Sequence, residues 1–420
     1  MYEALFPRIR RIYSALFSVA EIEKSPALQW AVGAIISSYA MSFTYWFYRT
    51  DTTVEGIREG TNICWPYFQS CQEFLFLHTL PHGYSQPLLY MLFFGLMLLS
   101  IYGLYKRDYF LAHVALLPLF LWHFSVSFFV TSSLLGNYDY YLIVFAITLL
   151  FLPYKTYFLR LFIVLLYFIS VVAKIHPAWV IGSYFSALHT GLPLFSKWAI
   201  PFWTNLVMFM ETVGTWFLLS NNRYLQRGAL VFFVVFHLYS GLLVGYHYPA
   251  VVLPFLLIFF GMFNQHVPPP LQRRAIAGWL LVVFLVCAPF IPRSISGDEK
   301  LTLEGNSYGL FMFESNHQCI SEAQVIFAEG HTRAIDKQSI NSRYRCDPYY
   351  FWSQLKRECL GSGVERMSWT FDHSINGGPF YRIVNVSDIC TLDYKPFGHN
   401  EWIQAEGAEV VGYPVENVYY

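Results

Sequence analysis

The chain has 420 residues, of which 55% are hydrophobic, 20% are aromatic and only 13% are charged. Ordinary soluble domains carry about 25% charged residues, so this chain has too few charges to cover a water-exposed surface. Its 27 basic residues balance its 27 acidic residues and form no basic tract. The composition therefore nearly excludes a soluble enzyme, and it also argues against a disordered chain or a nucleic-acid-binding protein.

Charge divides the chain into two regions. Residues 1–291 hold 16 basic and 10 acidic residues, a net charge of +6, and contain long apolar runs. Residues 292–420 hold 11 basic and 17 acidic residues, a net charge of −6, with the composition of a soluble domain. We therefore expect a polytopic α-helical membrane domain over residues 1–291, followed by a water-facing α+β domain over residues 292–420.

Nine apolar runs approach the ~20 residues that a helix needs to cross a bilayer. In chain order they cover residues 27–48, 87–105, 110–130, 138–152, 157–173, 201–220, 226–244, 248–263 and 275–291. The fourth and the eighth are short for a full crossing, so we expect them to be tilted or partly buried in protein. The pattern predicts about nine transmembrane helices.

Basic residues lie before the first run and then in, or a few residues beyond, every second connection between runs. They are Arg8, Arg10, Arg11, Lys106, Arg107, Lys155, Arg160, Arg223, Arg227, Arg273 and Arg274. The positive-inside rule places these connections and the N-terminus in the cytoplasm. Nine spans then place the C-terminal domain outside the cytoplasm, on the outer face of a bacterial inner membrane or in the lumen of a eukaryotic endoplasmic reticulum.

Cysteine positions agree with this topology. Six of the seven cysteines fall on the predicted outer side, and they are Cys64, Cys71, Cys319, Cys346, Cys359 and Cys390. An oxidising compartment favours disulfides among them, and no pair has the C-x-x-C spacing of a zinc site. The residues alone leave the pairing open.

The C-terminal region has signals for both strands and helix. Residues 323–327 and 381–386 favour strands, and residues 348–358 form the pattern of a short amphipathic helix. Asn376-Gly377-Gly378-Pro379 predicts a turn. These signals predict an α+β domain.

Ionisable residues inside membrane spans are energetically expensive, so each is a candidate site residue. The candidates are His123, Asp139, Lys174, Glu211 and His237. With the predicted topology, they are biased toward the outer half of the membrane. The sequence lacks the glycine-rich nucleotide loops, the H-E-x-x-H zinc motif and the G-x-S-x-G nucleophile motif.

Lys174 is the sharpest of these candidates. It ends a dozen uncharged residues and precedes Ile175-His176-Pro177-Ala178-Trp179. Burial disfavours a charged amine and favours a neutral one, which can accept a proton. A lysine at the end of a span can instead extend its charge to the membrane surface beside a tryptophan.

The other candidates also have structural alternatives. His237 can be a satisfied hydrogen-bond donor, and Glu211 can be paired with a neighbouring cation or stay protonated. Asp139, which is flanked by tyrosines, can be a hydrated residue at the entrance of a span. His123 carries the weakest signal of the five.

Four segments carry a family resemblance. Residues 166–174 read Leu-Tyr-Phe-Ile-Ser-Val-Val-Ala-Lys and are followed by Trp179-Val180-Ile181-Gly182, and Phe236-His237-Leu238 precedes Gly245. The stretch from Asn306 to Gln318 contains Phe311-Met312-Phe313, and Phe371-Asp372-His373-Ser374-Ile375-Asn376 follows it. In this order and spacing, they resemble the vitamin K-dependent γ-glutamyl carboxylases and their bacterial relatives, the HTTM-domain proteins.

The resemblance implies an enzyme in which Lys174 is the catalytic base, with His237 and Tyr167 lining the same cavity. In the family, the lysine deprotonates reduced vitamin K or another quinol. The resulting anion reacts with oxygen to give a strong base, and the glutamate carbanion captures carbon dioxide. Asp139, Glu211 and His123 are expected around the quinol, and no metal is expected. The resemblance also implies a disulfide from Cys359 to Cys64 or Cys71.

One departure bears on the reaction. The carboxylases carry an Asn-His pair before the fourth span, whereas this chain reads Asn137-Tyr138-Asp139, so that Asp139 occupies the place of the histidine. We therefore expect a quinol-dependent membrane enzyme that performs carboxylation or related chemistry on a peptide or small molecule. The first alternative is a non-catalytic membrane scaffold for the maturation of a secreted peptide, in which Lys174 is dispensable. The second is a proton or solute translocator, which needs titratable groups in both leaflets.

Overall fold

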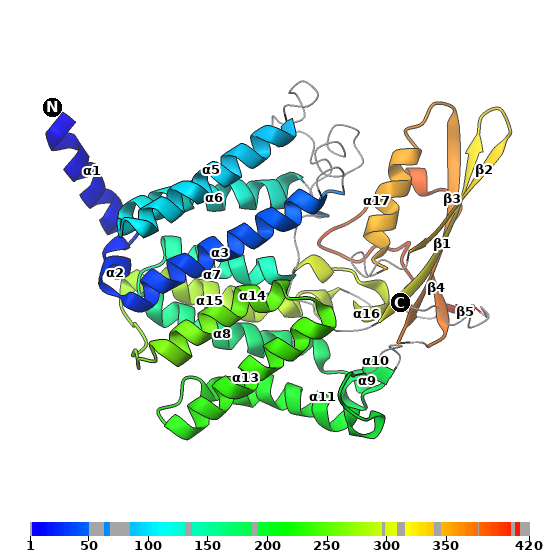
Figure 1. The fold of residues 1–420 in the computed structure, drawn as a ribbon. Coiled ribbons are helices and arrows are strands. Elements are labelled where there is room, and N and C mark those ends of the chain that lie inside the picture. Colours follow the sequence, from blue (N-terminus) through cyan, green and yellow to red (C-terminus); the bar gives the residue numbers. More distant parts are fainter. Residues whose placement is uncertain are drawn as a thin grey trace. The chain divides into compact units, whose positions relative to one another are not determined.

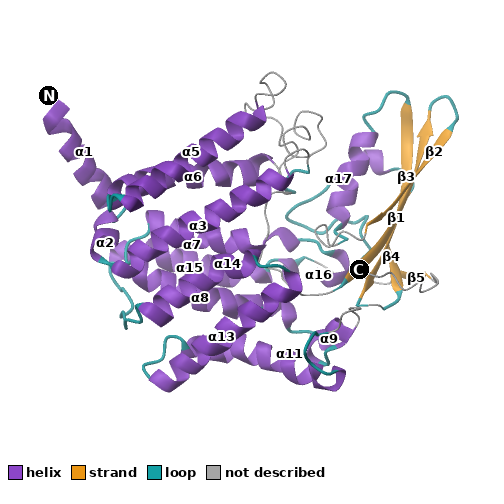
Figure 2. Cartoon of the chain, viewed as in Figure 1, coloured by secondary structure: helices purple, strands orange, loops and turns teal. Residues whose placement is uncertain are grey.

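A computed structural model describes residues 2–49, 63–67, 85–130, 137–186, 192–295, 299–308, 316–339, 346–376, 378–404 and 408–411. The described chain is mostly helical and has a small antiparallel sheet in its C-terminal region (Figures 1 and 2). It divides into two compact units. The first comprises Met1–Trp65, Ser70–Ile169 and Met210–Val286, and the second comprises Pro66–Gln69, Ser170–Phe209 and Cys287–Tyr420.

The first unit is built from helices. In chain order they are α1 (Tyr2–Leu16), α2 (Val19–Lys24), α3 (Pro26–Arg49), α5 (Ser85–Tyr105), α6 (Tyr109–Ser125), α7 (Asn137–Phe151), α8 (Lys155–Ser170), α12 (Thr215–Phe217), α13 (Arg223–Val244), α14 (His247–Leu256) and α15 (Ile276–Cys287). Three π-helical segments extend or interrupt them: η3 (Val126–Val130), η7 (Met210–Gly214) and η8 (Leu257–Met262).

Three helical stretches are long and apolar enough to cross a membrane: Tyr109–Phe129, Arg223–Leu243 and Arg273–Phe290. Three further apolar stretches, Tyr90–Tyr105, Asn137–Phe151 and His247–Met262, are shorter. Length and composition of the described residues thus support a membrane protein with three candidate spans, fewer than the nine expected. Helices do occur at all nine expected runs, but among the described residues the others are too short or not apolar enough to qualify as spans.

Close helix packing in the first unit depends on small residues. A Cβ atom on Gly103 of α5 would lie 2.6 Å from the backbone nitrogen of Ala112 on α6. A Cβ atom on Gly278 of α15 would overlap the ring of Phe158 on α8. Glycine is therefore required at both positions for the helices to approach this closely.

Two basic residues that the topology prediction placed in a cytoplasmic connection are buried. Lys155 Nζ donates to the Leu152 carbonyl at 2.7 Å, and its backbone nitrogen donates to the Glu21 carboxylate at 2.9 Å. The Arg160 guanidinium donates to the Phe259 carbonyl in η8 and to Asn264 Oδ1. These side chains satisfy backbone carbonyl groups at a helix end and in a π-helix. Their positive charge therefore does not indicate a water-exposed surface.

The second unit combines short helices with the sheet. The helical elements are η5 (Val172–Lys174), α9 (Pro177–Val180), α10 (Ser183–Ser186), η6 (Lys197–Ala199), α11 (Ile200–Phe209), α16 (Glu299–Thr302), η12 (Asn306–Tyr308), α17 (Pro348–Glu358) and η13 (Ile389–Thr391). The strands are β1 (His317–Phe327), β2 (Thr332–Ser339), β3 (Val364–Ile375), β4 (Phe380–Val386) and β5 (Glu409–Val411). The sheet order is β2-β1-β3-β4-β5, with every pair antiparallel.

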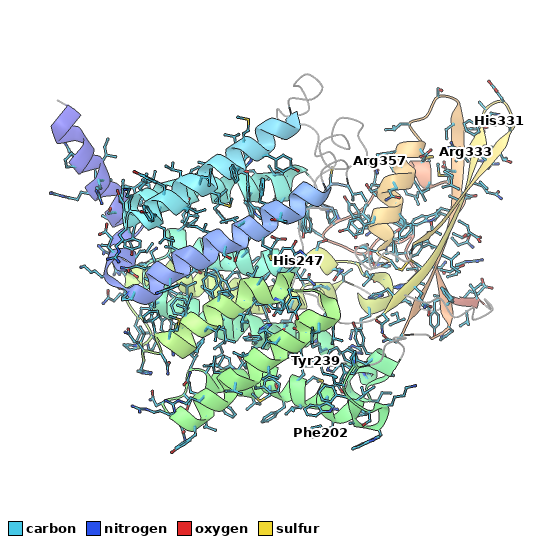
Figure 3. The ribbon with its side chains drawn as sticks, viewed as in Figure 1. Phe202, Tyr239, His247, His331, Arg333 and Arg357 are labelled. Carbon is cyan, nitrogen blue, oxygen red and sulfur yellow. A yellow bond between two sulfur atoms is a disulfide. The ribbon has the colours of Figure 1, made fainter. Side chains whose placement is uncertain are left out.

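The C-terminal predictions are confirmed. The expected strands lie within β1 and β4, the expected helix is α17, and the turn signal falls between β3 and β4. The core of the unit packs Phe351 and Leu355 of α17 with Trp369 and Phe371 of β3. Figure 3 labels Arg357 on α17 and Arg333 on β2, and the latter donates to Glu358 at 2.7 Å. The fold of this region is therefore α+β.

Disulfides occur where they were expected, but the implied pairing is wrong. Cys319 bonds to Cys346 and Cys359 bonds to Cys390, and Cys64 is also disulfide-bonded. Cys359 follows the last residue of α17, and Cys390 lies in η13 of the same core, so Cys359 is not available to Cys64 or Cys71. Cys71 lies outside the described residues.

Candidate functional site

Lys174 ends a 3-10 turn that directly follows α8. Its side chain is only 2% exposed, and Nζ lies 5.7 Å from the centre of the Trp179 ring on α9. Trp179 is itself buried, and its Nε1 donates to the Thr204 carbonyl on α11 at 3.2 Å. A lysine that extended its charge to the membrane surface would be exposed, whereas this amine is enclosed against a fixed aromatic ring.

The segment that carries Lys174 is tied to other parts of the second unit. Arg293 donates to the Val172 carbonyl at 3.3 Å, and Asn316 Nδ2 donates to the Tyr184 carbonyl at 2.6 Å. Gly182 adopts a φ of +78° and packs against Ile200, so the turn between α9 and α10 requires glycine. The backbone around Lys174 is therefore held by side chains from the C-terminal region.

The Phe371–Asn376 motif has a structural role in this arrangement. Arg382 makes two hydrogen bonds to the Asp372 carboxylate, at 2.9 and 3.1 Å. Asn376 makes two hydrogen bonds to Asn316. Its backbone nitrogen donates to the Asn316 carbonyl at 2.8 Å, and its Oδ1 accepts from the Asn316 backbone nitrogen at 2.9 Å. Since Asn316 in turn contacts Tyr184, the motif positions the segment that follows Lys174.

A histidine pair lies beside this motif. His373 is fully buried on β3, and its Nδ1 lies 2.5 Å from the Leu301 carbonyl. A carbonyl only accepts, so Nδ1 carries the proton and Nε2 is the acceptor. The His317 Nδ1, at 2.9 Å, must then donate to it. The two bonds fix the neutral tautomer of His373.

A second candidate group lies in the first unit, and we call it the tyrosine cluster: Tyr141, Tyr167, His237 and Tyr248. Tyr167 hydrogen-bonds His237 Nε2, and Tyr248 donates to the Tyr141 hydroxyl at 2.8 Å. The His237 and Tyr248 ring centres are 5.1 Å apart. A phenol that is hydrogen-bonded to an imidazole can pass a proton between oxygen and nitrogen, so the Tyr167–His237 pair is chemically able to move a proton.

Glu211 belongs to the surroundings of the tyrosine cluster. It is buried in the π-helix η7 and interacts electrostatically with Tyr141, Tyr167 and Tyr248. π-Helical turns often mark functional sites, because they displace side chains from the regular helical face. Figure 3 labels Tyr239 on α13 and His247 at the start of α14, the two helices that carry His237 and Tyr248.

His123 and Asp139 form a separate buried pair. His123 Nε2 on α6 lies 3.8 Å from Asp139 Oδ1 on α7, and Ser42 Oγ on α3 lies 3.3 Å from the same oxygen. The Tyr39 ring contacts the His123 ring with centres 5.3 Å apart. Asp139 is therefore an interior residue with polar partners from two other helices, rather than a hydrated entrance residue.

The structure brings together some of the predicted site residues. Tyr167 and His237 are hydrogen-bonded to each other, and Glu211 lies near them. His123 and Asp139 form a separate pair. Lys174 belongs to the second unit. Sequence reasoning missed Tyr248, which reads as an ordinary aromatic residue at the end of a span. Tyr141 was noted in the sequence only as one of the tyrosines that flank Asp139, and that clustering was the available signal for its place in the site. Among the described residues, no three His, Cys, Asp or Glu side chains converge as a metal site requires.

Comparisons with known proteins identify no relative. No family model, no curated protein and no solved structure matches the chain.

Proposed function

We propose that this chain is a multi-pass membrane enzyme, similar to the γ-glutamyl carboxylases, that uses a quinol and oxygen to modify a peptide or small molecule. The burial of Lys174 against Trp179 is the observation that carries this proposal. The family resemblance of the surrounding residues supplies the reaction class, and carboxylation of glutamate is the leading reaction within it.

Lys174 would act as the base. In its neutral amine form, Nζ would accept a proton. Nζ would accept the hydroxyl proton of a bound quinol, forming an N–H bond as the O–H bond breaks. The Trp179 ring lies 5.7 Å from the amine, and the bonds from Arg293 to Val172 and from Asn316 to Tyr184 hold the backbone on either side of Lys174. When bound, the quinol would supply the reducing chemistry with oxygen that generates the stronger base used in the carboxylase family.

The tyrosine cluster is compatible with a quinol-processing protein. Tyr167 stacks on Phe233 with ring centres 4.2 Å apart, and its hydroxyl bonds His237. Aromatic faces suit a planar ring, and phenol and imidazole groups can hydrogen-bond a hydroxyl or a carbonyl oxygen. We propose that His237 and Tyr167 handle protons in this reaction.

The proposal includes a membrane topology. Nine spans, with the N-terminus in the cytoplasm, would place residues 292–420 outside it. The two disulfides of the second unit support an oxidising environment for this region. A peptide substrate that is modified outside the cytoplasm would then meet the same unit that carries Lys174.

Substitution of Lys174 tests the proposed base. Purified full-length chain is assayed for oxygen-dependent oxidation of reduced vitamin K or menaquinol. Lys174→Ala and Lys174→Arg should each lose about 10²-fold or more of the activity, which is the usual contribution of a general base. Arginine keeps the positive charge but does not accept a proton at any working pH. Lys197→Ala is the matched control, because Lys197 is an exposed lysine of the same unit.

The result also separates the alternatives. If Lys174→Arg oxidises quinol as fast as the parent, the base assignment is wrong. If the parent oxidises none of the quinols, the non-catalytic scaffold replaces the enzyme as the better account. A scaffold predicts that Lys174→Ala still supports maturation of its secreted peptide.

A further inference from the structure

An apolar groove runs along the surface of the first unit. It encloses about 1160 Å³, more than the roughly 300–1,000 Å³ of a typical small-molecule pocket. Its walls come from α3, α13, α14 and η8, and its end comes from the turn between α5 and α6. The groove is distinct from the tyrosine cluster, none of whose four residues lines it.

The groove is open on one side. Trp30, Leu238 and Met262 line it, and they are 57%, 51% and 59% exposed. In a membrane-spanning protein, apolar side chains exposed in this way meet lipid. The wall from Pro249 to Met262 is about 20 Å long at ~1.5 Å per residue. Half of a ~30 Å hydrocarbon core is ~15 Å, so the groove can hold an extended acyl chain.

One end of the groove carries a positive charge. Arg107 lines the groove, lies in the turn between α5 and α6, and is exposed. The neighbouring Asp108 carboxylate accepts from the Leu111 nitrogen at 3.1 Å and lies 3.6 Å from Arg10. Within the described residues, no ion pair neutralises Arg107. Its φ of 56° lies in the left-handed region, which few non-glycine residues adopt. The turn thus holds an arginine in an unusual conformation at the end of an apolar groove.

We propose that the groove binds an anionic phospholipid, with one acyl chain along α3 and α14 and the phosphate at Arg107. A guanidinium and a phosphate form strong, charge-assisted hydrogen bonds. A zwitterionic lipid brings a positive charge of its own to the same place, and a quinone brings no anion. The proposal is independent of Lys174 and of the proposed reaction.

Lipid retention tests the charge at Arg107. Purified full-length chain is exchanged into micelles that contain equal amounts of phosphatidylglycerol and phosphatidylcholine, then repurified, and the co-purified lipids are quantified. About one phosphatidylglycerol per chain should be retained in preference to phosphatidylcholine. Arg107→Asn should reduce this preference about fivefold, and asparagine tolerates a left-handed φ. Arg274→Asn is the control, because it removes an exposed arginine that does not line the groove.

A second variant tests the groove itself. Gly33 lines it, and a Cβ atom there would meet only Leu104, at an ordinary 3.6 Å. Gly33→Leu should therefore fold and should fill the groove, so the amount of retained lipid should fall. Gly95→Leu on α5 is the matched control, because a Cβ atom there meets nothing within 4 Å and Gly95 is outside the groove.

Four outcomes would overturn the proposal. They are equal retention of the two lipids by the parent, an unchanged preference in Arg107→Asn, unchanged lipid retention in Gly33→Leu, and recovery of a quinone in place of phospholipid.

Discussion

His373 shows how one buried side chain can make the stability of the second unit depend on pH. Burial, together with the nearby His317, lowers the pKa of His373 from its ordinary 6.5 to about 3, although the hydrogen bond to the Leu301 carbonyl acts in the opposite direction. The tautomer that donates to Leu301 and accepts from His317 is neutral. Protonation would convert the acceptor Nε2 into a donor that faces another donor.

The sign of the pH effect follows from this lowered pKa. Between pH 6.5 and pH 3, the unfolded chain binds a proton at His373 and the folded chain does not, so stability is lost as the pH falls. We expect the opening free energy of β3 to drop by about 2 kcal/mol from pH 7 to pH 5. Hydrogen-exchange protection of β3, corrected for the intrinsic exchange rate, measures this change.

Two variants separate His373 from other titrating groups. His373→Asn keeps a donor for Leu301 but cannot titrate, so it should flatten the pH dependence. His331→Asn is the control, because His331 is exposed at the turn between β1 and β2 (Figure 3). An equal pH slope in His373→Asn and the parent would contradict the assignment.

At the scale of single residues, the sequence pointed to some of the contacts and missed others. The sequence singled out Lys174 together with Tyr167 and His237, and the structure shows a hydrogen bond between Tyr167 and His237. It did not reveal that Lys155 and Arg160 are buried, because a positive charge next to an apolar run looks the same whether it faces water or satisfies backbone carbonyls. Tyr248 could not be predicted, since its contact with Tyr141 depends on how α7 and α14 pack.

Among the secondary-structure elements, α17 could be predicted from the sequence and β2 could not. Asp347 caps α17 by accepting from the Tyr349 nitrogen at 2.9 Å, and Pro348 occupies its first position. Both are strong local signals for the start of a helix. The β2 sequence, Thr332–Ser339, contains Arg333, Asp336 and Lys337, so it lacks an apolar alternation. It lies at the edge of the sheet, where charged residues are common.

The π-helical segments are a feature of the helices that the sequence did not predict. Hydropathy detects apolar runs, but it does not detect a changed hydrogen-bond register within a run. In η8, the register change leaves the Phe259 and Phe260 carbonyls to accept from Arg160 and Gln226. These polar partners lie far away in the sequence, so no local pattern reveals them.

The Cys359–Cys390 disulfide joins α17 to η13, and its removal should destabilise the second unit. It closes a loop of 31 residues, which corresponds to about 3–4 kcal/mol in the chain-entropy model. The double variant Cys359→Ser/Cys390→Ser should lower the opening free energy of α17 by this amount, as measured by hydrogen exchange. Cys287→Ser, which removes a free and exposed cysteine, should have no effect. Peptide mapping that links Cys359 to Cys64 or Cys71 would refute the pairing.

At the scale of the whole molecule, the compact units do not follow the chain order that composition suggests. Composition divides the chain between residues 291 and 292, whereas Ser170–Phe209 packs with the C-terminal region in the second unit. Bonds from Arg293 to Val172 and from Asn316 to Tyr184 contribute to this packing. These contacts connect residues more than 100 positions apart, so they could not be read from local patterns.

The proposed topology can be tested with engineered cysteines in a Cys287→Ser background. Arg223→Cys and Arg273→Cys replace exposed basic residues that the positive-inside rule assigns to the cytoplasm. Glu329→Cys lies in the turn between β1 and β2, which the proposal places on the opposite side. In sealed vesicles of known orientation, a membrane-impermeant thiol reagent should label the two arginine positions only from the cytoplasmic face, and Glu329→Cys only from the other. Labelling of all three positions from one face would contradict the topology, since it would place the disulfide-bonded unit in the reducing compartment.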